Sequence, residues 1–459
     1  MLRWRFLIFN LLLTSCSLCS IAQNQAKHPS EFSLEEAVNY AIQNSIPAEN
    51  SRLNAAISKN RALEVVTQGL PKISGKFEYN NYFQIPTTII PNFFSQVDSN
   101  LIPILGEDIP TGDSIEAQFG ASHVADFALE WTQLVIDGRY FVGLKARQGV
   151  IKLADKQHEL NLIGIKENVT KAYYAALIAS ESKTILQSNL ETLENVLYET
   201  KVMYENGLAE ELDVDRLELS LSNLQTRIHQ TETNADNAMN ALKFHIGLDL
   251  KNEIQLSETL SNLLIFSPEL NAAVAPENRI EHSILKTLVD LRKYDITQVQ
   301  AGYFPSIFAF ANYGFNAQRD KFNFFKKGNW FRTGIVGFSI NVPIFDGLEK
   351  HAAIQKRKLE LQERKNNLEN FQRSMDLEVR SSNSSFANSH NTYLDQKKNL
   401  ELAEKIHSKL LIMYQEGVGS SFELAEAKSE LINTQLNYLQ SVHNLLIAKT
   451  SLEKALGKL

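Results

Sequence analysis

Two glutamates near the C-terminal end of the sequence, Glu423 and Glu426, are acidic residues at a spacing that could let them attract cations together. They are three residues apart, so on a helix both carboxylates lie on one face. At a constriction, such carboxylates attract cations and repel anions. The alternative is a solvated face of an amphipathic helix, which is the commonest position for glutamate.

No other group of side chains has the spacing of a catalytic or ligand-binding site. The histidines show no HExxH sequence and no i, i+4 pair, and Gly417-Val418-Gly419 lacks the strand that precedes a nucleotide-binding loop. No acid/base pair or nucleophile arrangement indicates an enzyme. We therefore expect no catalysis, no cofactor and no bound metal. The net charge of −7, from 46 basic and 53 acidic residues, argues against binding to nucleic acid.

The N-terminus has the pattern of a secretory signal peptide. Two arginines and an apolar run from Phe6 to Leu13 precede small residues that end at Ala22. We expect cleavage after Ala22, which makes residues 1–22 the signal peptide and removes both cysteines. The alternative is a lipoprotein signal that ends before Cys16, because Leu13-Thr14-Ser15-Cys16 resembles a lipobox whose cysteine is acylated.

The elements that must position the glutamates occur twice, at an offset of 209 to 210 residues. Asp137-Gly138 is repeated as Asp346-Gly347, and the segment from Tyr204 to Gly207 is repeated as Tyr414 to Gly417. A repeat at a fixed offset indicates two copies of one structural unit. We assign residues 31–247 to repeat 1, residues 248–276 to a linker and residues 277–457 to repeat 2.

Long helices form most of each repeat. A capping box at Ser33 and Glu36 starts the first helix, which we expect to be interrupted near Pro47. The 68 residues from Gly138 to Glu205 contain no proline, and as a helix they would extend roughly 100 Å. Apolar residues recur at intervals of three and four, which is typical of helices packed side by side. We expect long helices over residues 138–205, 211–246, 347–415 and 420–456, and shorter ones near 33–68 and 277–300.

Three segments show the two-residue alternation of β-strands, and a fourth, from Ser306 to Phe315, is apolar on both faces. In the first, Ile73 and Phe77 fall on one face, whereas Lys76 and Glu78 fall on the other. Each segment is about ten residues long, which suits a tilted strand that crosses a bilayer. The alternative is a small surface sheet packed on helices. We expect strands at residues 72–83, 123–136, 304–316 and 331–344, and a long exposed loop at 84–121.

Four strands per chain cannot close a barrel by themselves. An open sheet edge in hydrocarbon leaves backbone amide and carbonyl groups without partners. If the strands span a membrane, the chain must therefore oligomerise.

These features together resemble the TolC-type outer-membrane efflux proteins over essentially the whole mature chain. The matching pieces are the opening Ser33-Leu34-Glu35-Glu36-Ala37, Leu70-Pro71 and Phe304-Pro305 before strands, the Asp-Gly pairs and the two Tyr-x-x-Gly turns. The resemblance implies a mainly α fold with a β-barrel part. Two tandem repeats would supply long antiparallel helices to a periplasmic α-barrel, and four strands to a transmembrane β-barrel shared by a homotrimer. Residues 248–276 would form an equatorial belt.

The resemblance also implies a function in the cell outer membrane, with contact to its lipid and a large periplasmic extension. Such proteins are passive exit ducts that join a periplasmic adaptor (membrane fusion) protein and an inner-membrane RND or ABC transporter. We expect export of small molecules such as drugs or toxic compounds. One alternative is an exit duct for type I protein secretion. An alternative from another class is a periplasmic helical adaptor or scaffold, which the four strands disfavour.

Several residues match functional positions of the family. Glu423 and Glu426 match acidic residues that ring the periplasmic mouth, where threefold symmetry would gather six carboxylates. An aspartate in the first turn region is linked in the family to a tyrosine and an arginine in the second. Asp213 and Tyr414 match, whereas Gly419 stands at the arginine position. We therefore expect a closed-state lock formed by a Tyr414–Asp213 hydrogen bond without a salt bridge. Gly207 and Gly417 would be the turn glycines at the helix tips.

Overall fold

The computed structural model describes residues 30–92, 113–264 and 276–459. The expected signal peptide and Cys16 lie outside the described residues. The chain divides into two compact units, a helical unit and a sheet unit, which are treated separately below. Within the described ranges, the helical unit comprises residues 30–49, 163–264 and 381–459, and the sheet unit comprises residues 50–92, 113–162 and 276–380.

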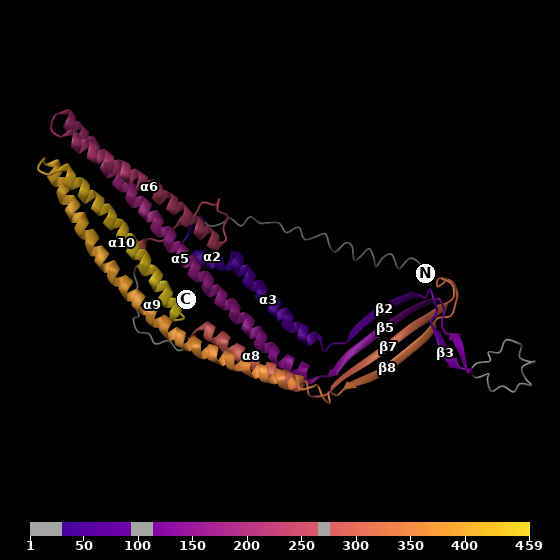
Figure 1. Cartoon of the computed structure of the whole chain (residues 1–459). Coiled ribbons are helices and arrows are strands. Elements are labelled where there is room, and N and C mark those ends of the chain that lie inside the picture. The colour runs from indigo at the N-terminus through magenta and orange to yellow at the C-terminus, as the bar shows by residue number, and fades with distance from the viewer. Residues whose placement is uncertain (1–29, 93–112, 265–275) are drawn as a thin grey trace, which may run out of the picture. The chain divides into compact units, whose positions relative to one another are not determined.

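Two antiparallel helical hairpins dominate the helical unit (Figure 1). The first pairs α5 (Gly138–Glu205) with α6 (Glu211–Ile246), and the second pairs α9 (Glu349–Gln415) with α10 (Ser421–Ala455). These bounds lie within two residues of those expected from the sequence. None of the helices in the described ranges is both long and apolar enough to cross a membrane.

A continuous apolar core joins the two hairpins near their tips. Its residues recur every three or four positions along α5, α6 and α10, so each helix turns one stripe toward the others. Burial of such stripes supplies most of the stability of long helices, because helix propensity alone is weak. The buried members are Leu186, Leu193, Val196, Leu197, Leu217, Leu224, Ile228, Tyr414, Leu424 and Ile432.

Local sequence signals explain where the first helices begin and end. The Ser33 hydroxyl accepts from the Glu36 amide, and the Glu36 carboxylate accepts from the Ser33 amide at 2.9 Å, which forms the expected capping box. Helix α2 (Leu34–Asn44) ends one residue before α3 (Ile46–Thr67) begins. Pro47 lies in the first turn of α3, where its missing amide hydrogen costs no helical hydrogen bond.

The segment between the repeats contributes a small parallel sheet to the helical unit. Strand β1 (Glu31–Phe32) pairs with β6 (Gln255–Leu256), and a short helix, α7 (Leu260–Leu263), follows. The Tyr173 hydroxyl donates to the Phe32 carbonyl at 3.0 Å, which ties this sheet to α5. Residues 265–275 of the expected linker lie outside the described residues.

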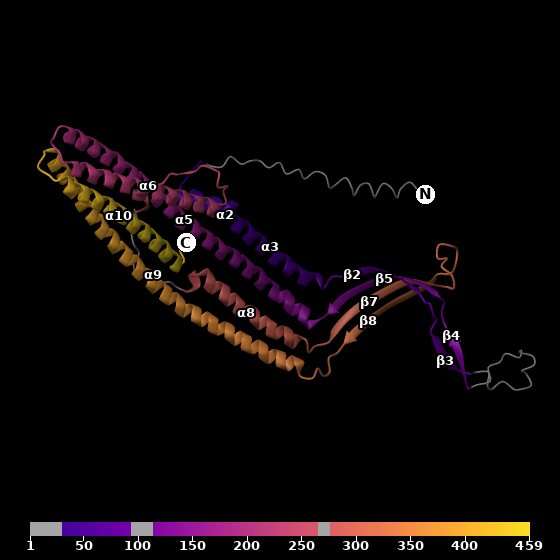
Figure 2. The ribbon, with the colours of Figure 1, turned by 45° about the horizontal axis from the view of Figure 1, so that its top comes forward.

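Four antiparallel strands form the main sheet of the sheet unit, in the order β2-β5-β7-β8 (Figure 2). The helices α3 and α8 (Ile280–Ala301) lead into β2 and β7, and a 3₁₀ turn, η2 (Pro276–Asn278), precedes α8. Among the described residues, β2 and β8 each pair with a strand on one side only. The strands are β2 (Lys72–Asn81), β5 (His123–Ile136), β7 (Ser306–Arg319) and β8 (Phe331–Asn341).

The strand register gives the sheet one mainly apolar face and one mixed face, on which β7 places Phe308 and Phe310 together with the polar residues of β2 and β5. Phe77 lies opposite Phe127, which in turn lies opposite Phe315, so the three rings share a face. The other face carries the Lys76–Glu78 ion pair at 2.6 Å and the Asp126 carboxylate, which accepts from Asn316 at 2.6 Å. Solvent-exposed members of the apolar face include Ile73, Phe77, Phe127, Leu129, Val336 and Phe338.

The expectation of an unbroken exposed loop at residues 84–121 is wrong. Strand β3 (Thr87–Pro91) pairs antiparallel with β4 (Ser114–Gln118) inside this range. The run Thr87-Thr88-Ile89-Ile90 consists of β-branched residues, which favour strands. The surrounding prolines outweighed this short run in the sequence interpretation. Residues 93–112 lie outside the described residues.

Candidate functional site at the helix tips

The two hairpin turns have the same backbone geometry. Gly207 and Gly417 have φ angles of 74° and 75°, in the left-handed region where glycine carries no side-chain penalty. The Gly207 amide donates to the Tyr204 carbonyl at 2.9 Å, and the Gly417 amide donates to the Tyr414 carbonyl at 3.0 Å. The repeated Tyr-x-x-Gly sequence therefore encodes one helix-ending turn in both copies.

The paired glutamates lie on the exposed face of α10. Helix α10 begins after Ser420, whose hydroxyl accepts from the Phe422 amide at 3.2 Å. Glu423 and Glu426 are both exposed, whereas Leu424 between them is buried in the core. In the part of the chain that the structure describes, neither carboxylate has a cation within 4.0 Å. Their charges are therefore available to a ligand or to symmetry copies.

Sequence reasoning missed a third carboxylate in this row. Glu430 is also exposed and follows Glu426 by four residues, so it continues the stripe along the helix. The signal was present as a 3-4 spacing of Glu423, Glu426 and Glu430. The stripe extends one turn farther from the tip than expected.

Asp213 links the two hairpins, but its partner is Ser421 and not the expected Tyr414. Its carboxylate accepts a short hydrogen bond from the Ser421 hydroxyl on α10. Its second oxygen accepts from the Glu210 amide at 3.3 Å and so caps the first turn of α6. Ser421 is buried at the start of α10, directly across from this carboxylate.

Tyr414 is buried in the apolar core and pairs with Thr200 instead of Asp213. The two hydroxyl oxygens lie 2.6 Å apart. Since the Thr200 hydroxyl also donates to the Val196 carbonyl at 2.8 Å, its single proton is used there and Tyr414 is the donor between them. The expected Tyr414–Asp213 bond is thus replaced by two separate bonds, because apolar packing turns the Tyr414 ring inward.

Both bonds connect the first hairpin to the second. Two further contacts do the same farther from the tips: Asn189 donates to Gln435 at 2.8 Å, and Arg227 donates to Asn433 at 2.8 Å. A hydrogen bond to a charged group contributes about 1.5–3 kcal/mol, and a neutral one about 0.5–1.5 kcal/mol. The Asp213–Ser421 and Arg227–Asn433 bonds both involve a charged group. The Asp213–Ser421 bond is part-buried and lies nearer the tips, whereas the Arg227–Asn433 bond is exposed, so the former is the candidate for a lock between the hairpins.

Asp213→Ala is expected to loosen the hairpin tips and to raise the conductance of the purified protein in planar bilayers. Ser421→Ala should also raise the conductance. The double variant should raise it little further, because both substitutions remove the same hydrogen bond. Asp215→Ala is the matched control, since Asp215 is exposed on the same helix two residues away. Unchanged conductance in both Asp213→Ala and Ser421→Ala would place the lock elsewhere.

A buried cation, Lys428, lines a cleft of about 410 Å³ between α6 and α10, about two turns along α10 from Ser421. Lys428 is only 6% exposed, and burial lowers its pKa to about 8. Burial, and then the charge of Lys428, also lowers the pKa of His407 on α9. Arg227 lines the same cleft, whose described lining residues include no carboxylate. Sequence reasoning missed Lys428, because a lysine on an amphipathic helix normally faces water.

Among the described residues, no three histidine, cysteine, aspartate or glutamate side chains converge as metal ligands would. The assembled site is instead a set of hydroxyl, carboxylate and buried cationic groups that joins two helical hairpins. It can hold or release the hairpins and present carboxylates at their tips.

Comparison with known sequences supports one family. Residues 285–458 match the family model described as outer membrane efflux protein. The outer membrane protein TolC of Escherichia coli is 21% identical over 355 residues, which are 74% of this chain and 70% of the relative. The toluene efflux pump outer membrane protein TtgF of Pseudomonas putida is 24% identical over 331 residues, which are 68% of this chain and 64% of the relative.

Solved structures of similar fold cover nearly the whole chain. The Campylobacter jejuni CmeC outer membrane channel has a TM-score of 0.72 at 15% identity and covers 93% of this chain and 85% of its own. The open state of the Neisseria gonorrhoeae MtrE outer membrane channel has a TM-score of 0.69 at 16% identity, with coverages of 92% and 88%. At these identities the likeness is one of fold.

Proposed function

We propose that this chain is a member of the outer membrane efflux protein family, whose model matches residues 285–458, and that it is the passive exit duct of a tripartite efflux pump. The protein lies in the outer membrane, where its four strands cross the bilayer and its helical hairpins extend into the periplasm. The observation that carries this proposal is the division of the β2-β5-β7-β8 sheet into a mainly apolar face and a mixed face.

The two faces suit lipid on one side and water on the other. Phe77, Phe127 and Phe338 are exposed on the apolar face, which for a sheet in water would be an unfavourable apolar patch. In a bilayer the same side chains contact hydrocarbon. The opposite face carries Lys76, Glu78 and Asp126, which suit the water-filled lumen of a channel.

The open edges of the sheet support assembly into a trimer. In the ranges that the structure describes, β2 and β8 have a neighbouring strand on one side only, so their outer backbone groups need partners in a bilayer. Three copies of a four-stranded sheet make a closed barrel in which β2 of one chain pairs with β8 of the next. The hairpins of three chains would then surround one tunnel, with Glu423 and Glu426 at its periplasmic mouth.

The helix tips are the proposed meeting point with a periplasmic adaptor protein, which joins the duct to an inner-membrane RND or ABC transporter. Export of small molecules is favoured over protein secretion because TtgF is named as part of a toluene efflux pump. The duct itself performs no chemistry in this proposal. Energy and cargo selection belong to the transporter.

The test combines the mass of the detergent-purified protein with single-channel recording in planar bilayers. We expect a mass near that of three processed chains, each somewhat below the 51.9 kDa of the full sequence. We also expect discrete conductance steps with a preference for cations. A protein that stays monomeric without detergent and gives no conductance would refute the duct and favour the periplasmic scaffold.

A further inference from the structure

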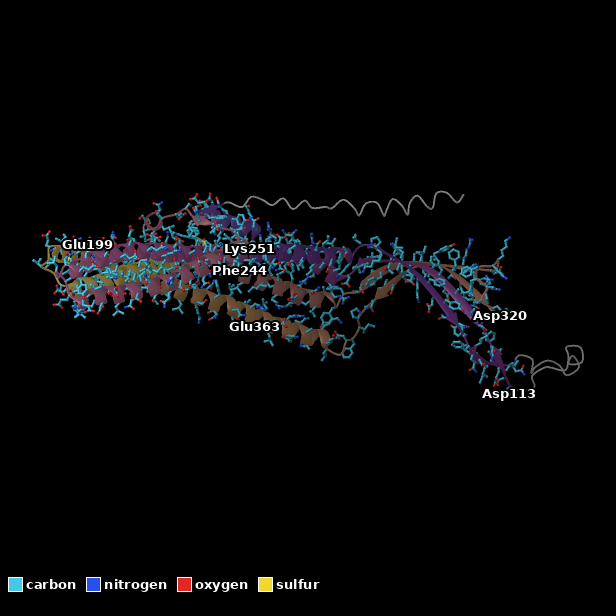
Figure 3. All side chains as sticks on the ribbon, turned by 90° about the horizontal axis from the view of Figure 1, so that it is seen from above. Asp113, Glu199, Phe244, Lys251, Asp320 and Glu363 are labelled. Atoms are coloured by element: carbon cyan, nitrogen blue, oxygen red, sulfur yellow. The ribbon has the colours of Figure 1, made fainter. Side chains whose placement is uncertain are left out.

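The β7–β8 loop, residues 320–330, places basic and aromatic side chains at the end of the sheet opposite α8. Asp320 marks this end of the sheet in Figure 3 and is the one acidic residue of the loop. We define the rim cluster as the loop and its two flanking arginines. Its cations are Arg319, Lys321, Lys326, Lys327 and Arg332, and its aromatic residues are Phe322, Phe324, Phe325 and Trp330.

The loop folds against the apolar face rather than the mixed face. The rings of Phe322 and Phe324 pack edge-on against Tyr79, with centroids 5.5 and 5.9 Å apart. The Tyr79 hydroxyl in turn lies 2.8 Å from Nδ1 of His123. In the strand register Tyr79 and His123 share the face of Phe77. The rim cluster therefore borders the side of the sheet that carries the exposed phenylalanines.

Two arginines lie on that same face at its edge. Arg319 stacks over the Phe324 ring at 5.6 Å, and Arg332 stacks over the Phe315 ring at 6.0 Å. In the described residues, none of the five cations of the rim cluster lies within 4.0 Å of a carboxylate. One Arg319 guanidinium nitrogen is buried without a hydrogen-bond partner. The cluster thus has positive charge that the described chain does not neutralise.

The most exposed aromatic ring of the rim cluster stands next to two of these charges. Phe325 is 93% exposed, and the exposed Lys326 and Lys327 follow it directly. A loop that faced only water would gain nothing from an exposed phenylalanine. At a membrane surface, the ring enters the boundary of the hydrocarbon and the ammonium groups reach the headgroups. Aromatic and cationic groups are therefore both satisfied in one environment.

We propose that the rim cluster binds the phosphate-bearing headgroups of membrane lipids at the rim of the apolar face. Lys326, Lys327, Arg319 and Arg332 contact the phosphates, and Phe325 inserts beside the acyl chains. This inference rests on the proposed function, because it assigns the apolar face to lipid. It adds a lipid-binding site to the duct and anchors the outer end of the sheet at the membrane surface.

The test uses full-length protein in detergent, titrated with phosphatidylglycerol or phosphatidylcholine, with bound lipid counted by native mass spectrometry. A cation near an anionic lipid surface contributes about a fivefold change in binding, so Lys326→Gln/Lys327→Gln should weaken phosphatidylglycerol binding roughly 25-fold. The matched control is Lys397→Gln/Lys398→Gln, which removes an adjacent exposed lysine pair from α9. Phe325→Ser should weaken binding of both lipids.

Each outcome decides the proposal. Weaker phosphatidylglycerol binding in the loop variant but not in the α9 variant supports the site. Equal binding in the two variants overturns it, and complete competition by inorganic phosphate would make the ligand a free anion rather than a lipid. Planar-bilayer conductance separates this inference from the proposed function: wild-type protein that conducts but shows no loop-dependent lipid binding retains the duct and loses the lipid site.

Discussion

Replacement of Glu423 and Glu426 together by glutamine is expected to abolish the cation selectivity of the channel. Both carboxylates are exposed, and neither is neutralised by a cation within the described chain. In the proposed trimer the change removes six negative charges from one constriction. Glutamine keeps the size and polarity of the side chains, so the tip should retain its packing.

The expected effect on divalent cation block is large. A carboxylate within about 4 Å of a cation contributes about 1 kcal/mol even at the dielectric constant of water. For a divalent ion each such contact contributes about twice as much, so one carboxylate corresponds to roughly 30-fold and two to roughly 900-fold in the binding constant of the blocking ion. Planar-bilayer recording of reversal potentials in a salt gradient, with a titration of a divalent cation, measures both quantities.

A matched pair of glutamates provides the control. Glu401 and Glu404 are also three residues apart and exposed, but lie on α9 more than two turns before the tip. Glu401→Gln/Glu404→Gln should leave selectivity unchanged. If the Glu423/Glu426 variant also kept its selectivity, these residues would form only a solvated helix face. A partial loss that becomes complete after Glu430→Gln would extend the constriction by one turn.

Lys428→Met is expected to stabilise the helical unit by about 3 kcal/mol at pH 7. Burial lowers the pKa of Lys428 to about 8 from the ordinary value of 10.5, and each unit of such a shift corresponds to about 1.4 kcal/mol. Methionine has a similar length without the charge, so it fills the same space and removes the cost of burying an ammonium group. Guanidinium denaturation of the full-length protein in detergent, followed by circular dichroism, measures the change.

The pH dependence supplies an independent check. Because the folded pKa lies below the unfolded value, the unfolded state binds more protons between about pH 8 and pH 10.5. The free-energy cost of burying the charged ammonium group of Lys428 is complete below pH 8, and it declines as the pH rises through this window. The advantage of Lys428→Met over wild type should therefore shrink toward zero by pH 10.5. An advantage that is constant with pH would mean that packing, not charge burial, explains it.

Lys405→Met is the control for this substitution. Lys405 is exposed on α9, and its replacement should change stability by less than about 0.5 kcal/mol. A destabilised Lys428→Met protein would show that the ammonium group is satisfied in the assembled trimer. In that case the cleft between α6 and α10 would contain a carboxylate from another chain.

Periodicity made the helices and main strands predictable. The helix from Gly138 to Glu205 has the expected bounds, because it begins at the glycine of the Asp137-Gly138 pair and ends at a glycine turn with no proline between. Strand β5 likewise begins at His123 and ends at Ile136 as expected. The fold class, long antiparallel helices with four strands, is confirmed by the structure and by the similar solved channels.

Short elements and side-chain partners were less predictable from the sequence. The β3–β4 pair rests on five residues per strand, which is too few for alternation to outweigh neighbouring prolines. The family resemblance predicted that Asp213 and Tyr414 lie at the helix tips and bind each other, but their partners are Ser421 and Thr200. Which hydroxyl meets which carboxylate depends on rotamers and core packing across about 210 residues of sequence, and no local pattern encodes that choice.

The sequence by itself determined the duplicated plan, the helix-ending turns and the alternation that divides the sheet into two faces. These features follow from local chemistry: glycine permits a left-handed turn, and apolar spacing sets the period of each element. Only the tertiary structure decided that Tyr414 turns inward, that Lys428 is buried in a cleft whose described lining includes no carboxylate, and that the β7–β8 loop lies on the apolar face. Those outcomes depend on contacts between elements distant in sequence, where packing selects among conformations that are locally equivalent.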